Sequence, residues 1–214
     1  MEDKKINEQE SLELITRMIQ QTKKDSAIGS GNMFLMWGYL NVFFSLAVAA
    51  MTYIRQEGGW GWLFMAIPII GFITAGIMAR RMKKINKAPS TYTTKSIGSI
   101  WGCMSVIFGI YAVFCIFKYD VPRLWTGMFF LGLLLPAIGT YCTGTILKEN
   151  RLQHLSTMGM AIALAYLGVL CTKDPVITID WVLIMAFSMI VNLVIPGHIL
   201  NYKAKKANKE QQAL

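Results

Sequence analysis

Charged side chains are scarce in this sequence: only 15% of its 214 residues are Asp, Glu, Lys or Arg, and 54% are hydrophobic. A soluble domain ordinarily carries about 25% charged residues. The deficit is concentrated in six uncharged runs of 18 to 29 residues, namely 26–54, 58–79, 96–117, 124–147, 155–172 and 181–202. A helix needs roughly 20 apolar residues to cross a bilayer. The runs argue against a soluble domain and predict six membrane-spanning helices.

The middle of each run also lacks the ionisable groups that ion-coupled transporters and intramembrane enzymes use. The two histidines, His154 and His198, lie near the ends of runs, and the four cysteines show no CxxC spacing. No metalloprotease, serine-hydrolase, phosphate-loop or paired acidic motif occurs. We therefore expect no catalytic residue, no metal and no cofactor, and a protein that is not an enzyme.

Basic residues are distributed unevenly between the two sides that six spans would create. The N-terminal tail, the second and fourth loops and the C-terminal tail hold 17 Lys and Arg, and the other three loops hold 4. Because basic residues stay on the cytoplasmic side, both termini are predicted to be cytoplasmic. This pattern, rather than nucleic-acid binding, explains the net charge of +9. The side chains predicted to contact lipid headgroups are Arg80, Arg81, Lys83 and Lys84.

These patterns predict an all-α membrane bundle of six transmembrane helices in three tandem hairpins, preceded by a cytoplasmic amphipathic helix. Residues 1–32 form the helix and its linker, 33–203 the membrane domain, and 204–214 a basic cytoplasmic tail. The first 25 residues are polar, so we expect no cleavable signal peptide and insertion directed by the first span. The predicted spans are 33–54, 59–79, 96–117, 124–147, 155–172 and 179–201.

The first two predicted hairpins, 33–80 and 96–148, resemble each other. One opens with "WGYLNVFFS" (Trp37–Ser45) and the other with "WGCMSVIFG" (Trp101–Gly109). Their returning helices share a Pro-x-x-Gly-x-x-x-x-Gly-x-x-x-basic pattern, at Pro68, Gly71, Gly76 and Arg80 and at Pro136, Gly139, Gly144 and Lys148. The third hairpin, 155–203, is a poorer copy. The pattern favours a tandem duplication, although chance likeness between membrane sequences is the alternative.

Two kinds of residue stand out inside the spans. Pro68 and Pro136 are predicted to kink their helices, because proline lacks an amide hydrogen and clashes with the preceding turn. This Pro/Gly pattern either serves ordinary helix packing or forms a conformational hinge or gate. The intramembrane polar candidates are Asn41, Ser105 and Asn192. A serine usually bonds back to its own helix, whereas the two asparagines either link helices or contact a pore or ligand.

The segment "ESLELITRMIQQTKK" (Glu10–Lys24) has a different pattern. At about 100° per residue its apolar side chains share one side of a helix, and the charged side chains lie on the other. Membrane-surface helices usually carry strongly basic polar faces, and this one is of mixed charge. The helix either rests on the bilayer or its own loops, or docks on a protein partner or a second copy through Leu12, Ile15, Met18 and Ile19.

The stretch "GSGNMFLMWGY" (Gly29–Tyr39), with its polar N-terminal helix and about six spans, resembles small bacterial inner-membrane proteins without a known activity. The resemblance covers most of the chain and implies a multi-pass protein of the bacterial cytoplasmic membrane. Two functions stay open. One is an accessory or regulatory protein that binds a partner through its N-terminal helix and basic loop Arg80–Lys95. The alternative is a transporter or channel for a neutral or lipophilic solute.

Overall fold

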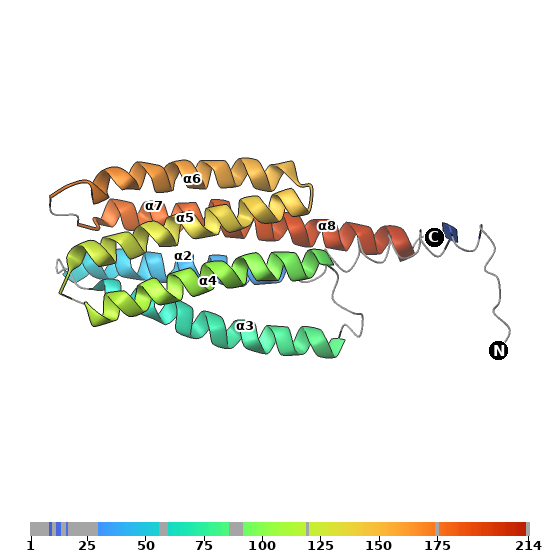
Figure 1. Ribbon diagram of the computed structural model, residues 1–214, viewed down its shortest axis with the longest axis horizontal. Coiled ribbons are helices and arrows are strands. Elements are labelled where there is room, and N and C mark those ends of the chain that lie inside the picture. Colours follow the sequence, from blue (N-terminus) through green and yellow to red (C-terminus); the bar gives the residue numbers. More distant parts are fainter. Residues whose placement is uncertain are drawn as a thin grey trace.

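The computed structural model describes residues 9, 12, 13, 16, 30–55, 60–85, 92–118, 120–173 and 176–212, and all regular structure in these residues is helical (Figure 1). The elements are α2 (Ser30–Arg55), a 3-10 helix η1 (Trp60–Met65), α3 (Ala66–Ile85), α4 (Tyr92–Phe117), α5 (Pro122–Ile146), α6 (Asn150–Leu170), α7 (Ile179–Met189), a π-helix η2 (Ile190–Val194) and α8 (Ile195–Gln212). Six helices are long and apolar enough to cross a membrane, which confirms the all-α, six-helix prediction at that level.

The helices run up and down in turn along one long axis (Figure 1). The segments η1 and α3 together make the second candidate span, and α7, η2 and α8 together make the sixth. As a result, α2 begins at the same end of the bundle at which α8 ends (Figure 1). Beyond that end α8 continues to Gln212, so residues 204–212, predicted as part of a separate tail, extend the last helix.

The last span is the central helix of the bundle. In its apolar window 61% of residues are buried, against 6% in α4 and 11% in the second span. It packs against α2 along most of its length and also contacts α5 and α6. Lipid tails are as apolar as leucine, so close packing and hydrogen bonds hold membrane helices together. The contacts around this span therefore specify how the helices pack.

Glycines bring α2 and the last span into backbone contact. A Cβ added at Gly31 would lie 2.7 Å from the carbonyl oxygen of Gly197, and one at Gly197 would lie 3.0 Å from that of Gly31. One turn further along the last span, Val194 packs against Gly38. Small residues allow such close approach between membrane helices. The first and last spans thus close the bundle on each other.

Backbone hydrogen bonds define the very short turn in which α5 ends and α6 begins. The Glu149 N–H donates to the carbonyl of Gly144 at 2.8 Å, and that of Lys148 to Thr145 at 3.2 Å. With Lys148 at φ 53°, this is the Schellman arrangement that satisfies the last carbonyls of a helix. At the other end, Arg123 of α5 donates to the carbonyls of Thr172 and Lys173, both at 3.1 Å. Hydrogen bonds therefore stabilise both ends of the α5–α6 pair.

Candidate functional site

Two of the three predicted intramembrane polar residues bond within their own helices. The Asn41 amide donates to the carbonyl of Trp37 at 2.8 Å, and the Ser105 hydroxyl to that of Trp101, also at 2.8 Å. Both bonds reach back four residues, which is a common way to satisfy a polar side chain in a membrane helix. The two residues hold equivalent places in the first two hairpins, and neither shares a hydrogen bond with Asn192 among the described residues.

The third, Asn192, is fully buried in the π-helix η2 at the middle of the last span. Here the Ile195 N–H bonds to the carbonyl of Ile190, five residues earlier, which defines the wider π turn. Single π turns inside α-helices are frequent at functional sites. Asn192 and its surroundings are therefore the candidate site.

Proline and threonine explain how the backbone at this site is satisfied. Pro196 has no N–H to donate to the carbonyl of Asn192, four residues earlier. That carbonyl instead accepts a hydrogen bond from the Thr140 hydroxyl of α5 at 2.7 Å, and Thr140 is itself fully buried. A neighbouring helix thus supplies the donor that the proline removes, as is usual for broken helices in membranes.

The Asn192 side chain is enclosed by α6 and by its own helix. Its amide nitrogen donates to the Ser188 hydroxyl at 3.0 Å. Its amide group lies flat against Gly159 of α6, where an added Cβ would overlap it. The amide oxygen, however, has no hydrogen-bond partner among the described residues. The site can therefore accept one more hydrogen bond, but its surroundings are tightly packed.

Two other buried polar atoms in the described chain also lack a partner, the hydroxyls of Ser45 and Tyr166. Tyr166 lies between the rings of Phe129 and Trp181, with centroids 5.0 and 4.8 Å away. Ser45 follows Gly38 by seven residues, or about two turns, so it lies on the same face of α2. Neither hydroxyl forms a hydrogen bond with the Asn192 amide, since all three atoms lack a partner among the described residues.

The Trp and Gly residues of the two similar hairpins meet in the same way. Trp37 of α2 fills the space over Gly71 of α3, and Trp101 of α4 fills the space over Gly139 of α5. Trp101 also donates to the Thr143 hydroxyl at 3.2 Å and stacks edge-on against Phe34, at 5.2 Å between centroids. In each hairpin a tryptophan of the outgoing helix therefore packs on the first glycine of the returning one.

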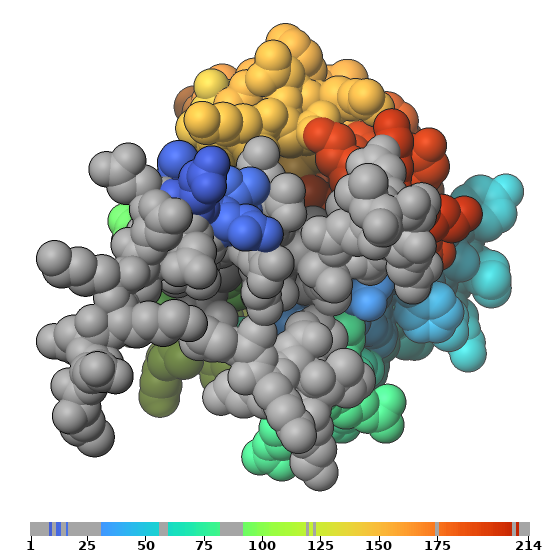
Figure 2. All heavy atoms as spheres, turned by 90° about the vertical axis from the view of Figure 1, so that its right-hand side faces the viewer, coloured from blue at the N-terminus to red at the C-terminus, as the bar shows by residue number. Residues whose placement is uncertain are grey.

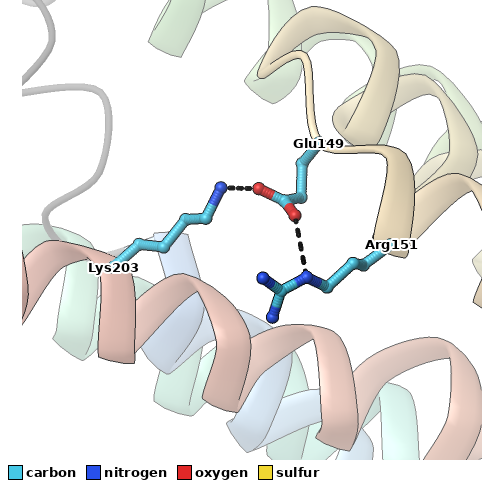
Figure 3. Close-up of polar contacts among 3 residues, drawn as sticks. All are labelled: Glu149, Arg151 and Lys203. Atoms are coloured by element: carbon cyan, nitrogen blue, oxygen red, sulfur yellow. Dashed lines mark ion pairs between the residues drawn. The ribbon is translucent and has the colours of Figure 1, made fainter.

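Sequence reasoning missed an ion cluster at the end of the bundle where α8 leaves it. Glu149, in the α5–α6 turn, is buried and pairs with Lys203 of α8 and, at 3.7 Å, with Arg151 (Figure 3). Tyr39 and His198 form a hydrogen bond of 2.9 Å between α2 and α8, and Asn201 donates to Asn32 at 2.8 Å. A glutamate flanked by basic residues in a predicted loop gave no signal that it would be buried.

Exposed basic side chains gather at the same end, which Figure 2 views face on, with α6 and α8 side by side at its upper edge. They come from the end of α3, the start of α4, the α5–α6 turn and α8, and are Arg80, Arg81, Lys95, Lys148, Arg151, Lys203, Lys205, Lys206 and Lys209. The opposite end carries Arg55, Lys118, Arg123 and Lys173 with Asp120 and Asp180. The two ends therefore differ in charge.

The remaining predicted residues are placed as follows. Leu12 is exposed, and Ile15, Met18 and Ile19 lie outside the described residues. Lys83 and Lys84 belong to the helical backbone of α3, beyond its last described side chain. Pro68 lies in the first turn of α3, where the chain passes from 3-10 to α-helix, and Pro136 lies inside α5. The predicted kinks stay predictions.

Comparison with protein-family models, with curated proteins and with solved structures found no match. Within the described part of the chain no three His, Cys, Asp or Glu residues gather where they could hold a metal ion. The class that the fold defines is a helical bundle of multi-pass membrane-protein type, with six candidate spans.

Proposed function

We propose that this protein is a non-enzymatic accessory or regulatory protein of the bacterial cytoplasmic membrane. It binds a protein partner through the apolar side of residues 10–24 and through the basic loop Arg80–Lys95. The observation that carries this proposal is that the three predicted intramembrane polar residues share no hydrogen bond with one another: Asn41 and Ser105 bond to their own helices, and Asn192 is buried and bonds to Ser188. The charged groups that a protein partner could contact lie at the two ends of the bundle.

Orientation and organisation form part of the same proposal. The gathering of basic side chains at the end where α8 leaves the bundle supports a cytoplasmic location for that end and for both termini. The matching Trp37–Gly71 and Trp101–Gly139 contacts support a tandem duplication of hairpins. We propose three such hairpins, of which the third has diverged.

The test is affinity purification after crosslinking in cells, with mass spectrometry of what is recovered. Ile15→Asp/Ile19→Asp places charge on the apolar side of the N-terminal helix, and Gln20→Asp places the same type of charge on the polar side. We expect a specific partner with the wild type and with Gln20→Asp, and its loss with the double variant. Equal recovery from all three, with equal membrane insertion, would show that this helix face is not the partner site.

A transporter or channel for a neutral solute is the alternative, and η2 favours it. Discontinuous helices near the bilayer midplane form the substrate sites of many transporters, and here the Asn192 amide oxygen lacks a partner among the described residues. Swelling of proteoliposomes in glycerol or urea measures such a flux. Flux that Asn192→Leu abolishes would support transport, whereas swelling equal to that of empty liposomes would oppose it.

A further inference from the structure

The helix α4 is the span that packs least within the described part of the chain. Only 6% of the residues in its apolar window are buried, against 28% in the first span and 61% in the last. It lies mainly on α5, where Trp101 fills the space over Gly139 and Tyr111 the space over Gly127. The opposite side of the helix is open, and we call it the α4 outer face. This face is formed by Gly102, Val106, Gly109, Val113 and Ile116.

The α4 outer face has the pattern of a helix-packing surface. Its residues are spaced alternately by four and three positions, which keeps them within an arc of about 80°. No described residue comes within 4 Å of a Cβ placed at Gly102 or Gly109, and Val106 and Val113 are 60% and 50% exposed. Gly98, equally open, extends the face by one turn and completes a GxxxG with Gly102. Small residues in this arrangement let two membrane helices approach closely.

The equivalent face of α2 already holds a membrane helix. Aligned on their tryptophans, the two similar hairpins match Gly38 with Gly102 and Ser45 with Gly109. A Cβ at Gly38 would lie 3.1 Å from the backbone nitrogen of Val194 in the last span, and Ser45 is fully buried. Because each tryptophan packs on the first glycine of its own returning helix, the two faces point the same way relative to their hairpins. The face that receives the last span in the first hairpin is thus left uncovered by the described residues in the second.

We propose that the α4 outer face binds the α4 outer face of a second copy of this chain. The occupant is an apolar membrane helix, because no charged side chain occurs from Gly98 to Ile116. It belongs to another chain, because the last span, which covers the matching face of α2, is already the central helix of its own bundle.

The choice of a second copy follows from symmetry. Two copies inserted with the same orientation can be related by a two-fold axis along the bilayer normal, which brings each residue near the axis against its own copy. The two α4 helices are then parallel, and Gly102 and Gly109 meet glycines at the same depth, as in GxxxG dimers. This inference requires insertion in a membrane but not the partner-binding role proposed above.

The test is disulfide crosslinking of the full-length protein in native membranes, with its four native cysteines replaced by serine. Val106→Cys lies on the α4 outer face, whereas Ile107→Cys, its control, lies beside the face at nearly the same depth and is also exposed. Val113→Cys and Phe114→Cys repeat this comparison about two turns further on. Mild oxidation should form dimers from the two face variants about tenfold faster than from their neighbours, because a disulfide needs Cα atoms within about 7 Å. Non-reducing gels measure the rates.

A second arm tests the close approach at the glycines. Gly102→Leu, added to Val106→Cys, should slow dimer formation by about tenfold, because a large side chain would hold the two helices apart. Gly168→Leu, at an equally open glycine of α6, should leave the rate unchanged. No described residue lies within 4 Å of a Cβ at either glycine, so neither change should disturb the packing of the monomer.

Three results would overturn the proposal. Equal rates at all four cysteine positions would mean random collision, and no dimer at any position would mean that the two faces do not meet. A product of another mass at the face positions would show that a different protein covers this face. Ile15→Asp/Ile19→Asp, added to Val106→Cys, should crosslink as fast as Val106→Cys alone. The dimer and the accessory role can therefore fail independently of each other.

Discussion

Gly159 is the position at which a single methyl group would disturb the centre of the bundle. The Asn192 amide lies flat against it, so a Cβ at residue 159 would overlap the amide. The amide is held by its bond to the Ser188 hydroxyl, so a shift away from residue 159 would strain that bond. We expect Gly159→Ala to destabilise the protein by about 1–3 kcal/mol, the usual cost of overpacking a core. Unfolding in mixed dodecyl maltoside and SDS micelles measures the change.

Gly168→Ala is the matched control, because Gly168 lies in the same helix and an added Cβ there would meet nothing. Both variants gain the same helix propensity, about 0.5–1 kcal/mol in favour of alanine. The difference between them therefore isolates the contact with Asn192. If both variants were equally stable, the packing of α6 on η2 described above would be wrong.

Within the last span, the break at η2 is explained by a pair of residues on different elements. Pro196 removes a donor and Thr140 of α5 supplies one, so the effects of changing them should not add. Thr140→Val is expected to cost about 1 kcal/mol in the wild-type background, since interhelix hydrogen bonds in membranes average somewhat less than this and the carbonyl is left unsatisfied. With Pro196→Ala, which restores an N–H to the chain, the same change should cost less.

A double-mutant cycle from the same micelle unfolding experiment gives the coupling between the two positions. Thr157→Val serves as control, because the Thr157 hydroxyl bonds to the carbonyl of His154 in its own helix and is exposed. Its cost should be small and independent of Pro196. Equal costs of Thr140→Val in both backgrounds would mean that Thr140 does not compensate for the proline.

The elements were predictable from sequence in unequal measure. The six helices could be predicted from the uncharged runs, because whether a segment is long and apolar enough to cross a bilayer depends only on that segment. Asn192 could be singled out as an amide inside an apolar run, but not the π turn around it. The donor to its carbonyl, Thr140, is 52 residues away and looks like any other membrane threonine. In the same way, the burial of Glu149 depends on its ion pair with Lys203 of α8. The sequence around residue 149 therefore could not predict it.

At the scale of the whole molecule, the sequence could not predict which helices pack against each other. A soluble helix shows which face it buries by the apolar stripe along one of its sides, whereas a membrane helix is apolar all round. The hairpin pattern placed neighbours in sequence beside each other. In the structure the last span packs most extensively on α2, and α6 on α5. Glycine pairs such as Gly31 and Gly197 specify the first of these contacts, and they become visible as a pair only in three dimensions.

The closure of the first span on the last can be tested with cysteine pairs in a protein whose four native cysteines are replaced by serine. Asn32 and Asn201 are joined by a side-chain hydrogen bond of 2.8 Å, so Asn32→Cys/Asn201→Cys should form a disulfide rapidly on mild oxidation in membranes. Asn32→Cys/Arg80→Cys is the control, because residue 80 is at the same end of the bundle and much nearer in sequence. Gel mobility after protease cleavage between the two positions measures each rate. A bundle built only from hairpins packed in sequence order would favour the 32–80 pair, whereas closure through Gly31 and Gly197 requires the 32–201 pair to react first.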